Sequence, residues 1–474
     1  MSRAVQVELR SFTYDGCHQP VLQELDFYLD YGRLTLLSGL SGSGKSTLLS
    51  LINGVIPRMS AGALDGQVLV DGEDLAGRTL SQISSKVGCV LQNPEAQIIH
   101  QEVEDEVAFG CENLGVEPGE IGRRVQALCS RLNLEPDWAT RALSGGQKQR
   151  LVAAATLAMG RDILIFDEPL ANLDRQGAQD LLALLRALAD QGKAVLLVEH
   201  RLDVALPYAD VVWELRDGQT HLVPDKANYL ASQVSLIRDR PEDRLPPGPP
   251  ALRAEGLVKR FGGRSVLEEL HLDLRAGERV LLLGENGCGK STLLAILARL
   301  LRADGGRVEQ FLDPALGRRA GRRWFQCVGV VYQNPNYQLF MPTVEQELTF
   351  AAADRDYALE LARRFELTPL LSRHPHSLSE GQKRRVTIAA ILAQKPRLLL
   401  LDEPTVGQDY PGLQTLVDAL NQVHREQGST MLTITHDFRC AAALCDRAVW
   451  LERGRVIRQG GKELAEQFFL APHP

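Results

Sequence analysis

Short apolar runs alternate along the chain with longer segments in which apolar residues recur every three or four positions. Residues 34–38, 88–91, 163–166 and 194–198 are almost continuously apolar, as is typical of strands buried on both faces of a parallel sheet. Residues 176–189 show the period of an amphipathic helix instead. The alternation predicts an α/β fold built around parallel strands.

The same order of elements occurs twice. Residues 34–49 recur as residues 279–294, and five landmarks follow in the same order in both halves: Lys45 with Lys290, Gln92 with Gln333, Ser144 with Ser379, Asp167 with Asp402, and His200 with His436. We therefore interpret the chain as two copies of one domain. The offset between paired landmarks falls from 245 to 235 residues, so the second copy is expected to be shorter in its middle.

A proline-rich stretch separates the copies. Five prolines lie within residues 235–252, and proline fixes φ and lacks a backbone donor. We predict a stiff spacer there that forms neither helix nor sheet. The expected division is a first domain at residues 1–234, a linker at 235–251 and a second domain at 252–474.

Composition and charge exclude some classes of function. The 474 residues suffice for two domains. Lysine and arginine number 53 against 60 aspartate and glutamate, a net charge of −7, so no nucleic-acid partner is expected. No apolar run approaches the ~18 residues of a membrane-spanning helix, and the N-terminus lacks the layout of a signal peptide. The chain is expected to stay in the cytoplasm.

A glycine-rich loop with the pattern G-x-x-x-x-G-K-[ST] follows an early strand in each copy. Such loops turn backbone N–H groups toward phosphate oxygens, their lysine reaches the terminal phosphates, and their hydroxyl holds Mg²⁺. We predict that both copies bind ATP and Mg²⁺, with Ser46 and Ser291 on the metal. The residues expected to bind the nucleotide are Gly39, Ser41, Gly42, Gly44, Lys45, Ser46 and Thr47, and Gly284, Asn286, Gly287, Gly289, Lys290, Ser291 and Thr292.

Two adjacent carboxylates end a later apolar strand in each copy, Asp167 with Glu168 and Asp402 with Glu403. Alternate residues of a strand point to opposite sides, so one carboxylate can face the metal and the other the attacking water. We predict that Asp167 and Asp402 support Mg²⁺. Glu168 and Glu403 would polarise or deprotonate the water that attacks the γ-phosphate.

The segments Leu-Ser-Gly-Gly-Gln at residues 143–147 and Leu-Ser-Glu-Gly-Gln at 378–382 precede helices. With the other motifs they resemble the nucleotide-binding domains of ABC-type ATPases, which implies ATP hydrolysis and, in each copy, a core sheet and a helical subdomain. In this family two domains pair head to tail, so the resemblance implies that the two halves of this chain pair with each other. Each ATP would then lie between the glycine loop of one copy and the Ser-Gly-x-Gly-Gln-like segment of the other.

The resemblance also implies roles for single residues. Tyr14 and Phe261 would stack on adenine, although a plain core or surface aromatic remains the alternative for both. Glu380 departs from the pattern, because the first copy has Gly145 there, and we expect at most a modest inequality between two active sites. The remaining roles are Gln92 and Gln333 on the metal and in catalysis, His200 and His436 as γ-phosphate switches, Asp174 and Asp409 as a contact between the sites, and Ser144, Gly146, Ser379 and Gly381 as the segments that close on ATP.

The stretches at residues 92–110 and 333–350 resemble the ATPase subunits of energy-coupling factor (ECF) transporters, the importers of vitamins and of nickel or cobalt ions. The resemblance implies a transmembrane coupling protein, a separate membrane subunit that binds substrate, and a position on the cytoplasmic face of the membrane. We expect an apolar groove for basic helices of the coupling protein, with a plain core as the alternative. The groove would use Val103, Val107, Val344 and Leu348, a floor of Ile98, Ile99, Leu339, Phe340 and Met341, and an acidic lip of Glu102, Asp105, Glu106, Glu345 and Glu347.

Two other classes of ABC-type protein stay open at this stage. One is the ATPase of a fused sugar importer, in which one half typically carries a degenerate motif. The other is a ribosome-associated ATPase of translation, in which the connector is a long charged arm. The transported substrate is not indicated by the sequence.

Overall fold

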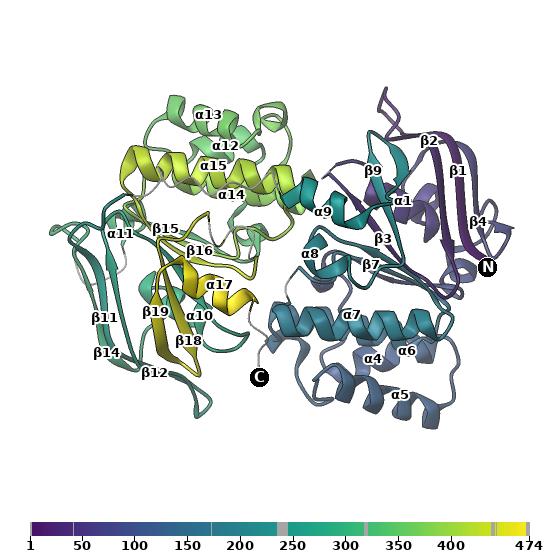
Figure 1. The fold of residues 1–474 in the computed structure, drawn as a ribbon, viewed down its shortest axis with the longest axis horizontal. Coiled ribbons are helices and arrows are strands. Elements are labelled where there is room, and N and C mark those ends of the chain that lie inside the picture. Colours follow the sequence, from purple (N-terminus) through teal and green to yellow (C-terminus); the bar gives the residue numbers. More distant parts are fainter. Residues whose placement is uncertain are drawn as a thin grey trace. The chain divides into compact units, whose positions relative to one another are not determined.

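The computed structural model describes residues 2–40, 42–171, 173–234, 245–316, 321–437, 441 and 443–470. The chain divides into two compact units, Met1–Gln233 and Val234–Pro474, and each is described by itself (Figure 1). Both units combine a mostly parallel six-stranded sheet with an antiparallel sheet, so the predicted α/β fold, duplicated in tandem, is confirmed.

The six-stranded sheet of the first unit carries the strands that the apolar runs predict. Its order is β10-β9-β3-β8-β7-β6, and all its pairs are parallel except β9 with β10. Every residue of β3, β7 and β8 is buried, as expected for central strands covered on both faces. The strands are β3 (Leu34–Gly39), β6 (Val87–Val90), β7 (Ile163–Asp167), β8 (Ala194–Val198), β9 (Val211–Arg216) and β10 (Gln219–Leu222).

A second, antiparallel sheet completes the first unit, in the order β2-β1-β4-β5. Its strands are β1 (Arg3–Tyr14), β2 (Leu22–Asp30), β4 (Gly62–Val70) and β5 (Glu73–Asp74). Residues alternate between buried and exposed along much of β1 and β2, which fits a sheet packed on one face. The buried side chains of that face and those of β3, β7 and β8 form one hydrophobic core.

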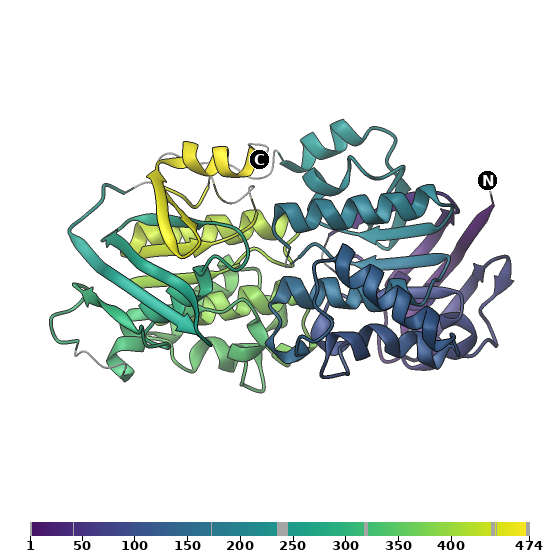
Figure 2. The same ribbon diagram turned by 90° about the horizontal axis from the view of Figure 1, so that it is seen from below.

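The helices of the first unit fall into two groups. The helices α4 (Val103–Asn113), α5 (Pro118–Arg131) and α6 (Gly145–Ala158) pack against one another and form a helical layer (Figure 2). The long helix α7 (Arg175–Asp190) buries one apolar face, as the period of residues 176–189 predicts. The other helices are α1 (Lys45–Ile52), α2 (Val55–Arg58), α3 (Leu80–Ser84), α8 (Leu202–Ala205) and α9 (Lys226–Val234).

The second unit repeats this plan. Its six-stranded sheet has the order β15-β16-β17-β13-β18-β19 and its antiparallel sheet the order β12-β11-β14. The strands are β11 (Pro250–Phe261), β12 (Arg264–Arg275), β13 (Arg279–Leu283), β14 (Gly305–Gln310), β15 (Val328–Val331), β16 (Leu398–Asp402), β17 (Thr430–Ile434), β18 (Arg447–Glu452) and β19 (Arg455–Gly460).

Part of the shortening of the second copy lies in its helical layer. There α12 (Val344–Thr349) and α13 (Arg355–Arg364) have 6 and 10 residues, where α4 and α5 have 11 and 14. Helix α14 (Glu380–Leu392) packs on both. The other helices are α10 (Lys290–Leu297), α11 (Arg322–Cys327), α15 (Tyr410–Gln427) and α17 (Lys462–Leu470).

The expectation that the proline-rich stretch forms no sheet is wrong at its end. Strand β11 begins at Pro250 and pairs with Arg275 of β12 at that residue, so it begins before residue 252, the expected start of the second domain. Proline is tolerated at the first position of a strand, where its missing donor costs no ladder bond. Residues 235–244 of the expected linker lie outside the described part of the chain.

The predicted walls of the apolar groove are also wrong, and the alternative of a plain core holds for them. The side chains of Val103, Val107, Val344 and Leu348 are fully buried. Glu106 and Glu347, expected on an acidic lip, are 5% and 8% exposed. The pattern of residues alone could not separate a helix face that lines a groove from one that fills a core.

The two buried glutamates hold the backbone of the preceding loop. Oε2 of Glu106 accepts hydrogen bonds from the N–H groups of Ile99 and His100, at 2.8 and 2.7 Å. Oε2 of Glu347 accepts those of Phe340 and Met341, both at 2.8 Å. Each carboxylate therefore fixes the loop that precedes its own helix.

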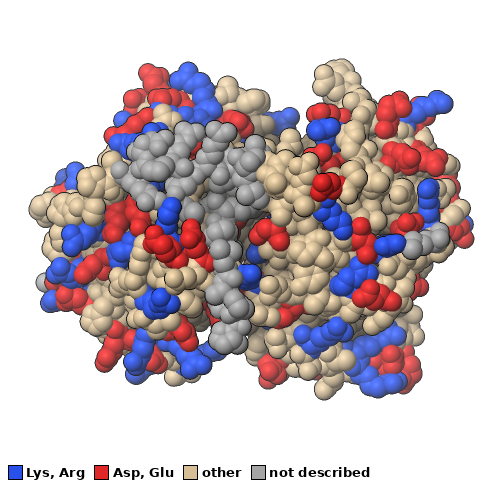
Figure 3. Space-filling model, viewed as in Figure 1, with Lys and Arg blue, Asp and Glu red and all other residues tan. Residues whose placement is uncertain are grey.

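No helix in the described ranges is both long and apolar enough to cross a bilayer. Lysine, arginine, aspartate and glutamate are interspersed over the described residues of the face in Figure 3.

We predict that Glu106→Ala loosens the loop at Ile99 and His100 by about 2 kcal/mol, because two part-buried backbone donors lose their acceptor. Glu106→Gln should cost much less, since both donors use one oxygen, which an amide can supply. Hydrogen exchange of these two amides in the full-length protein measures the effect. Equal exchange in the alanine variant and the wild type would contradict this role.

Candidate active site

Each glycine loop runs from the end of a central strand into a helix, and two of its glycines leave no room for a side chain. A Cβ at Gly39, the last residue of β3, would lie 2.3 Å from the carbonyl oxygen of Leu215. A Cβ at Gly44, which precedes α1 with φ 105°, would lie 2.7 Å from Cδ2 of Leu22. Only glycine therefore fits these positions.

The second glycine loop has the same geometry. A Cβ at Gly284 would lie 2.4 Å from the carbonyl oxygen of Leu451, and one at Gly289 would lie 2.7 Å from Cδ2 of Leu267. Gly42 and Gly287 both have φ of 81°. Ser41, which the motif also predicts to contact nucleotide, lies outside the described residues.

The loop lysines are buried and turned onto their own loops. Nζ of Lys45 donates to the carbonyl oxygens of Gly39 and Leu40, at 2.9 and 2.8 Å. Nζ of Lys290 donates to those of Gly284 and Glu285, at 2.6 and 2.8 Å. The ammonium groups thus lie inside the loops that would surround a phosphate.

The carboxylate pairs adjoin these loops. The two side chains of each pair do not alternate along one strand, as the sequence suggested, because only the aspartate belongs to the strand. Strand β7 ends at Asp167 and β16 at Asp402. The next residue, Glu168 or Glu403, has left the strand and takes a left-handed φ of 48° or 50°. Such a φ is strained for a residue with a side chain and is tolerated where the surrounding structure enforces it.

The aspartates fit the chemistry of a magnesium ligand. The side chain of Asp402 is hydrogen-bonded to Ser291, and burial raises the pKa of Asp402 although Ser291, Arg384 and Lys290 oppose the rise. Burial also raises the pKa of Asp167 to about 7, with the charge of Glu168 adding to the rise and Lys45 opposing it. Ser291 and Asp402 thus bring a hydroxyl and a carboxylate together, and such hard oxygen donors are what Mg²⁺ requires. These two residues would hold Mg²⁺ in the second unit, and Ser46 and Asp167, their equivalents, would hold it in the first.

Three predicted residues meet in the first unit. Oε1 of Glu168 lies 3.1 Å from Nε2 of His200, and Oε2 of Glu168 accepts a hydrogen bond of 3.0 Å from Nε2 of Gln92. Burial raises the pKa of Glu168, but the charge and hydrogen bond of His200, with Lys45 and Gln92, outweigh it and lower the pKa overall. Glu168 is therefore an ionised carboxylate in a buried position.

The equivalent contacts differ in the second unit. Nε2 of His436 lies 3.1 Å from Oδ1 of Asn286 in the glycine loop and 3.6 Å from Oε1 of Glu403. Oε2 of Glu403 accepts the backbone N–H of His436 at 3.1 Å. Gln333 follows β15, and its carbonyl oxygen accepts a hydrogen bond from Arg384.

The Ser-Gly-x-Gly-Gln-like segments begin helices. Oγ of Ser144 caps α6 by accepting the N–H of Gln147 at 3.3 Å, and Oγ of Ser379 caps α14 by accepting that of Gln382 at 3.4 Å. Gly146 and Gly381 follow in the first turn of these helices and are buried. A capped helix start can present N–H groups to an anion. Pairing of the two copies stays a prediction.

Asp174 and Asp409 also cap helices, a role that the sequence did not indicate. Oδ1 of Asp174 accepts the N–H of Gly177 at 2.9 Å at the start of α7. Oδ1 of Asp409 accepts that of Gly412 at 2.7 Å at the start of α15. Their predicted contact between the two sites stays a prediction.

The two expected adenine-stacking residues have different surroundings. The hydroxyl of Tyr14 is 3.0 Å from Oγ1 of Thr47, so Tyr14 lies against the first glycine loop and its helix. Phe261 is 50% exposed at the end of β11, and Nζ of Lys259 lies 5.2 Å from the centre of its ring. Thr292 of α10 is the residue equivalent to Thr47.

Sequence reasoning missed two buried charged residues beside the site. Glu199 precedes His200 and is 2% exposed, and burial and the charge of Glu168 raise its pKa. Arg384 of α14 is 3% exposed and donates to the carbonyl oxygens of Tyr332 and Gln333. Neither has a local signal in the sequence, because Glu199 and Arg384 bind backbone groups of distant segments.

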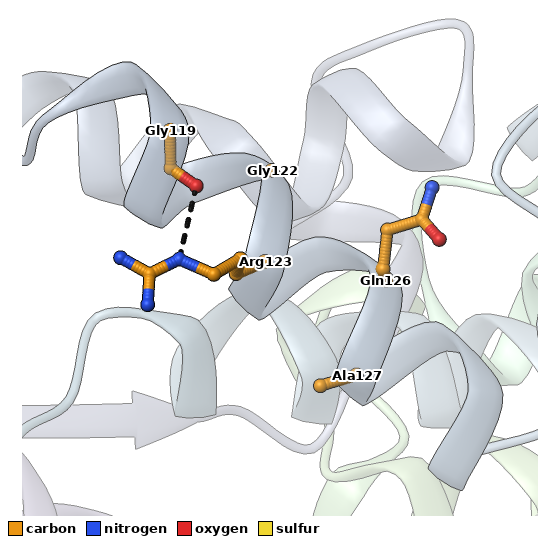
Figure 4. A pocket seen from close by; sticks show the side chains of 5 residues that line it. All are labelled: Gly119, Gly122, Arg123, Gln126 and Ala127. Carbon is orange, nitrogen blue, oxygen red and sulfur yellow. Dashed lines mark hydrogen bonds between the residues drawn. The ribbon is translucent and has the colours of Figure 1, made fainter.

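A hollow of about 680 Å³ lies on α5, lined by Gly119, Gly122, Arg123, Gln126 and Ala127 (Figure 4). Nε of Arg123 donates to the carbonyl oxygen of Gly119 across part of it. None of these residues belongs to the motifs above.

The assembled groups can bind phosphate and activate water. The glycine loops and their lysines offer N–H groups and positive charge to phosphate oxygens. Glu168 and Glu403 would be the groups to take a proton from a water, and His200 and His436, at 3.1 and 3.6 Å from them, would orient it or contact a terminal phosphate. Mg²⁺, when bound, supplies charge neutralisation of the phosphates.

Comparison with known proteins gives a consistent result. The family model described as ABC transporter matches residues 22–171 and 267–406. The chain is 32% identical to a protein of Methanosarcina mazei named "Putative ABC transporter ATP-binding protein", over 99% of this chain and 90% of that one. It is 31% identical to "Putative HMP/thiamine import ATP-binding protein YkoD" of Bacillus subtilis, over 94% of this chain and 89% of that one.

Solved structures with the same fold include a chain of ribosome-bound archaeal Pelota and ABCE1, with a TM-score of 0.73, 22% identity and coverage of 97% of this chain and 80% of that one. The RNase-L inhibitor has a TM-score of 0.67, 22% identity and coverage of 98% and 92%. At this identity the likeness extends to the fold alone.

We predict that Asp167→Asn stabilises the nucleotide-free protein at pH 8 while it abolishes Mg²⁺-dependent chemistry at the first site. The pKa of Asp167 is raised by folding, so the wild type loses stability as the pH rises toward and through about 7, and asparagine escapes this loss. The thermal midpoint should rise by about 4 °C at pH 8 and by much less at pH 5.

A matched control is Asp162→Asn, which neutralises an exposed carboxylate at the other end of the same strand. It should show no gain that grows with pH. A gain for Asp167→Asn that is equal at both pH values would contradict the assigned pKa.

Proposed function

Because this chain belongs to the ABC transporter ATP-binding family and carries two sets of nucleotide-binding motifs, we propose that it is the ATP-hydrolysing subunit of an ECF-type membrane importer of a micronutrient. ATP hydrolysis is expected of the family. The importer class, the Mg²⁺ sites and the membrane partners belong to the proposal. The observation that carries it is a pair of equivalent exposed apolar side chains, Ile99 and Phe340.

Ile99 and Phe340 occupy the same position of the two copies, 69% and 75% exposed. A buried glutamate seven residues later holds the backbone N–H of each. An exposed large apolar side chain on a fixed backbone suits insertion into a partner surface. Ile99 and Phe340 follow Gln92 and Gln333, in the stretches where the ECF resemblance places the coupling protein. We therefore propose one exposed apolar contact residue in each unit, here called an anchor, in place of the expected groove.

The stretches of sequence that carry the two anchors also differ. In the second unit Tyr337 and Phe350 are also 61% and 74% exposed, and Phe350 directly follows the shortened helix α12. Aromatic side chains supply large contact area at low conformational cost. We propose that the two units contact different helices of a transmembrane coupling protein.

The remaining parts of the proposal follow from the importer class. A separate membrane subunit would bind the substrate, and this chain would lie on the cytoplasmic face of the membrane. The relative named for HMP/thiamine import supports a vitamin or vitamin precursor, with a metal ion as the other substrate class. The two halves would pair with each other around two ATP molecules, and no nucleic-acid partner is proposed.

We predict that Glu168→Gln and Glu403→Gln each lower the turnover of ATP by the full-length chain, because each site would lose its base. The double variant should lose about 10²-fold or more while it still binds ATP. Glu452→Gln, an exposed glutamate at the end of β18, is the control for an equivalent change elsewhere. Unchanged turnover in either single variant would contradict hydrolysis at that site.

We predict that Ile99→Arg with Phe340→Arg removes the integral membrane proteins that co-purify with a tagged chain from detergent-solubilised membranes. Each anchor would then carry a positive charge that must be buried against a basic helix without a partner. ATP binding by the isolated variant should match the wild type. Ile457→Arg, at a 45% exposed position of β19, is the control, and retention of the membrane proteins by the anchor variant would reject this docking surface.

A further inference from the structure

Glu199 is a buried carboxylate whose two oxygens are occupied by the backbone around the first catalytic glutamate. Oε1 accepts the N–H of Leu170 at 2.8 Å. Oε2 accepts the N–H groups of His200 and Arg201, at 3.0 and 3.3 Å. Glu199 therefore ties the turn after Glu168 to the segment that carries the switch histidine.

Arg201 strengthens the same connection. Its Nη1 donates to the carbonyl oxygens of Leu170 and Leu173, at 3.2 and 3.1 Å. Leu173 directly precedes Asp174, the capping residue of α7. Residues 199–201 thus hold both the amide and the carbonyl groups of the turn between the catalytic glutamate and this helix.

In the second copy, neutral hydroxyl groups occupy the positions equivalent to Glu199 and Leu170. Thr435 stands where the first copy has Glu199, and Thr405 stands where it has Leu170. Their hydroxyl oxygens are 2.8 Å apart, and Oγ1 of Thr435 also accepts the N–H of Asp437 at 3.1 Å. Without a carboxylate at residue 435, the N–H of His436 is accepted by Glu403 instead.

This difference changes what each catalytic carboxylate can bind. In the first unit Glu199 accepts the histidine N–H, and Glu168 uses one oxygen for the ring of His200 and the other for Gln92. In the second unit one oxygen of Glu403 is engaged by the backbone of His436. The first site therefore has its base, its glutamine and its histidine in one set of direct contacts.

We infer that Glu199 is a positioning residue of the first ATP site, which frees the carboxylate of Glu168 from the backbone and so makes this site the faster of the two. The inference rests on ATP hydrolysis at both sites, as proposed above. Glu199 acts through Glu168 and Gln92 and needs no contact with the nucleotide.

The test uses the full-length chain with Glu403→Gln, in which only the first site can turn over. Adding Glu199→Gln places an NH₂ group against at least one backbone donor, and we expect kcat to fall about tenfold, with KM for ATP within about twofold. Rates are normalised to the amount of ATP bound in EDTA, so that unfolded protein does not count. If the background itself is inactive, the same comparison is made with both glutamates present.

Two further variants separate positioning from a general loss of stability. Asp210→Asn removes another part-buried carboxylate that caps a strand, 2.8 Å from the N–H of Leu34, and should lower the thermal midpoint without changing the normalised kcat. In a Gln92→Ala background the loss of kcat caused by Glu199→Gln should shrink to about twofold or less, because Glu199 can no longer act through the side chain of Gln92.

An unchanged normalised kcat in Glu199→Gln would overturn the inference. A tenfold loss that persists in the Gln92→Ala background would also overturn it. So would a first site, measured in Glu403→Gln, that is slower than the second site, measured in Glu168→Gln. Absence of ATP turnover by the wild-type chain would instead reject the proposed function. The two failures are therefore distinguishable.

Discussion

A buried carboxylate that must be held by polar neighbours is the constraint on which each candidate active site depends. Glu168 and Glu403 are 8% and 5% exposed and take a left-handed turn immediately after a central strand. A buried charge is costly unless it is paired and hydrogen-bonded. The lysine of the glycine loop, the histidine after the next strand and the glutamine after the edge strand come from distant parts of the sequence, and the parallel sheet brings them to one edge.

The two copies hold the backbone beside this carboxylate in different ways, which a shared set of motifs does not indicate. The first copy places a second carboxylate, Glu199, beside the base and uses it to hold the backbone. The second copy uses a pair of threonine hydroxyls and lets the base accept the histidine N–H itself. Duplication thus preserved the reacting groups while their supports diverged. Sites with identical reacting groups need not work at the same rate.

A buried glutamate that holds backbone donors recurs away from the nucleotide. Glu106 and Glu347 each hold two N–H groups of the loop that presents Ile99 or Phe340. Charge-assisted hydrogen bonds of this kind are stronger than neutral ones, so they can fix a loop that carries an exposed apolar residue. The fixed loop follows the glutamine that contacts the catalytic glutamate in the first unit. A partner that moves the loop would therefore act close to the site of hydrolysis.

The sequence by itself determined the duplication, the α/β class and the central strands, and it singled out the candidate reacting groups, because these depend on local patterns: apolar runs, glycine positions and residues at strand ends. Only the tertiary structure decided which charged residues are buried and what they bind. Helix periodicity put Val103 and Glu106 on different faces, yet both are inside, since the loop at Ile99 folds over the glutamate. Glu199 was equally out of reach, because its partners Leu170 and His200 are joined only when strands β7 and β8 lie side by side.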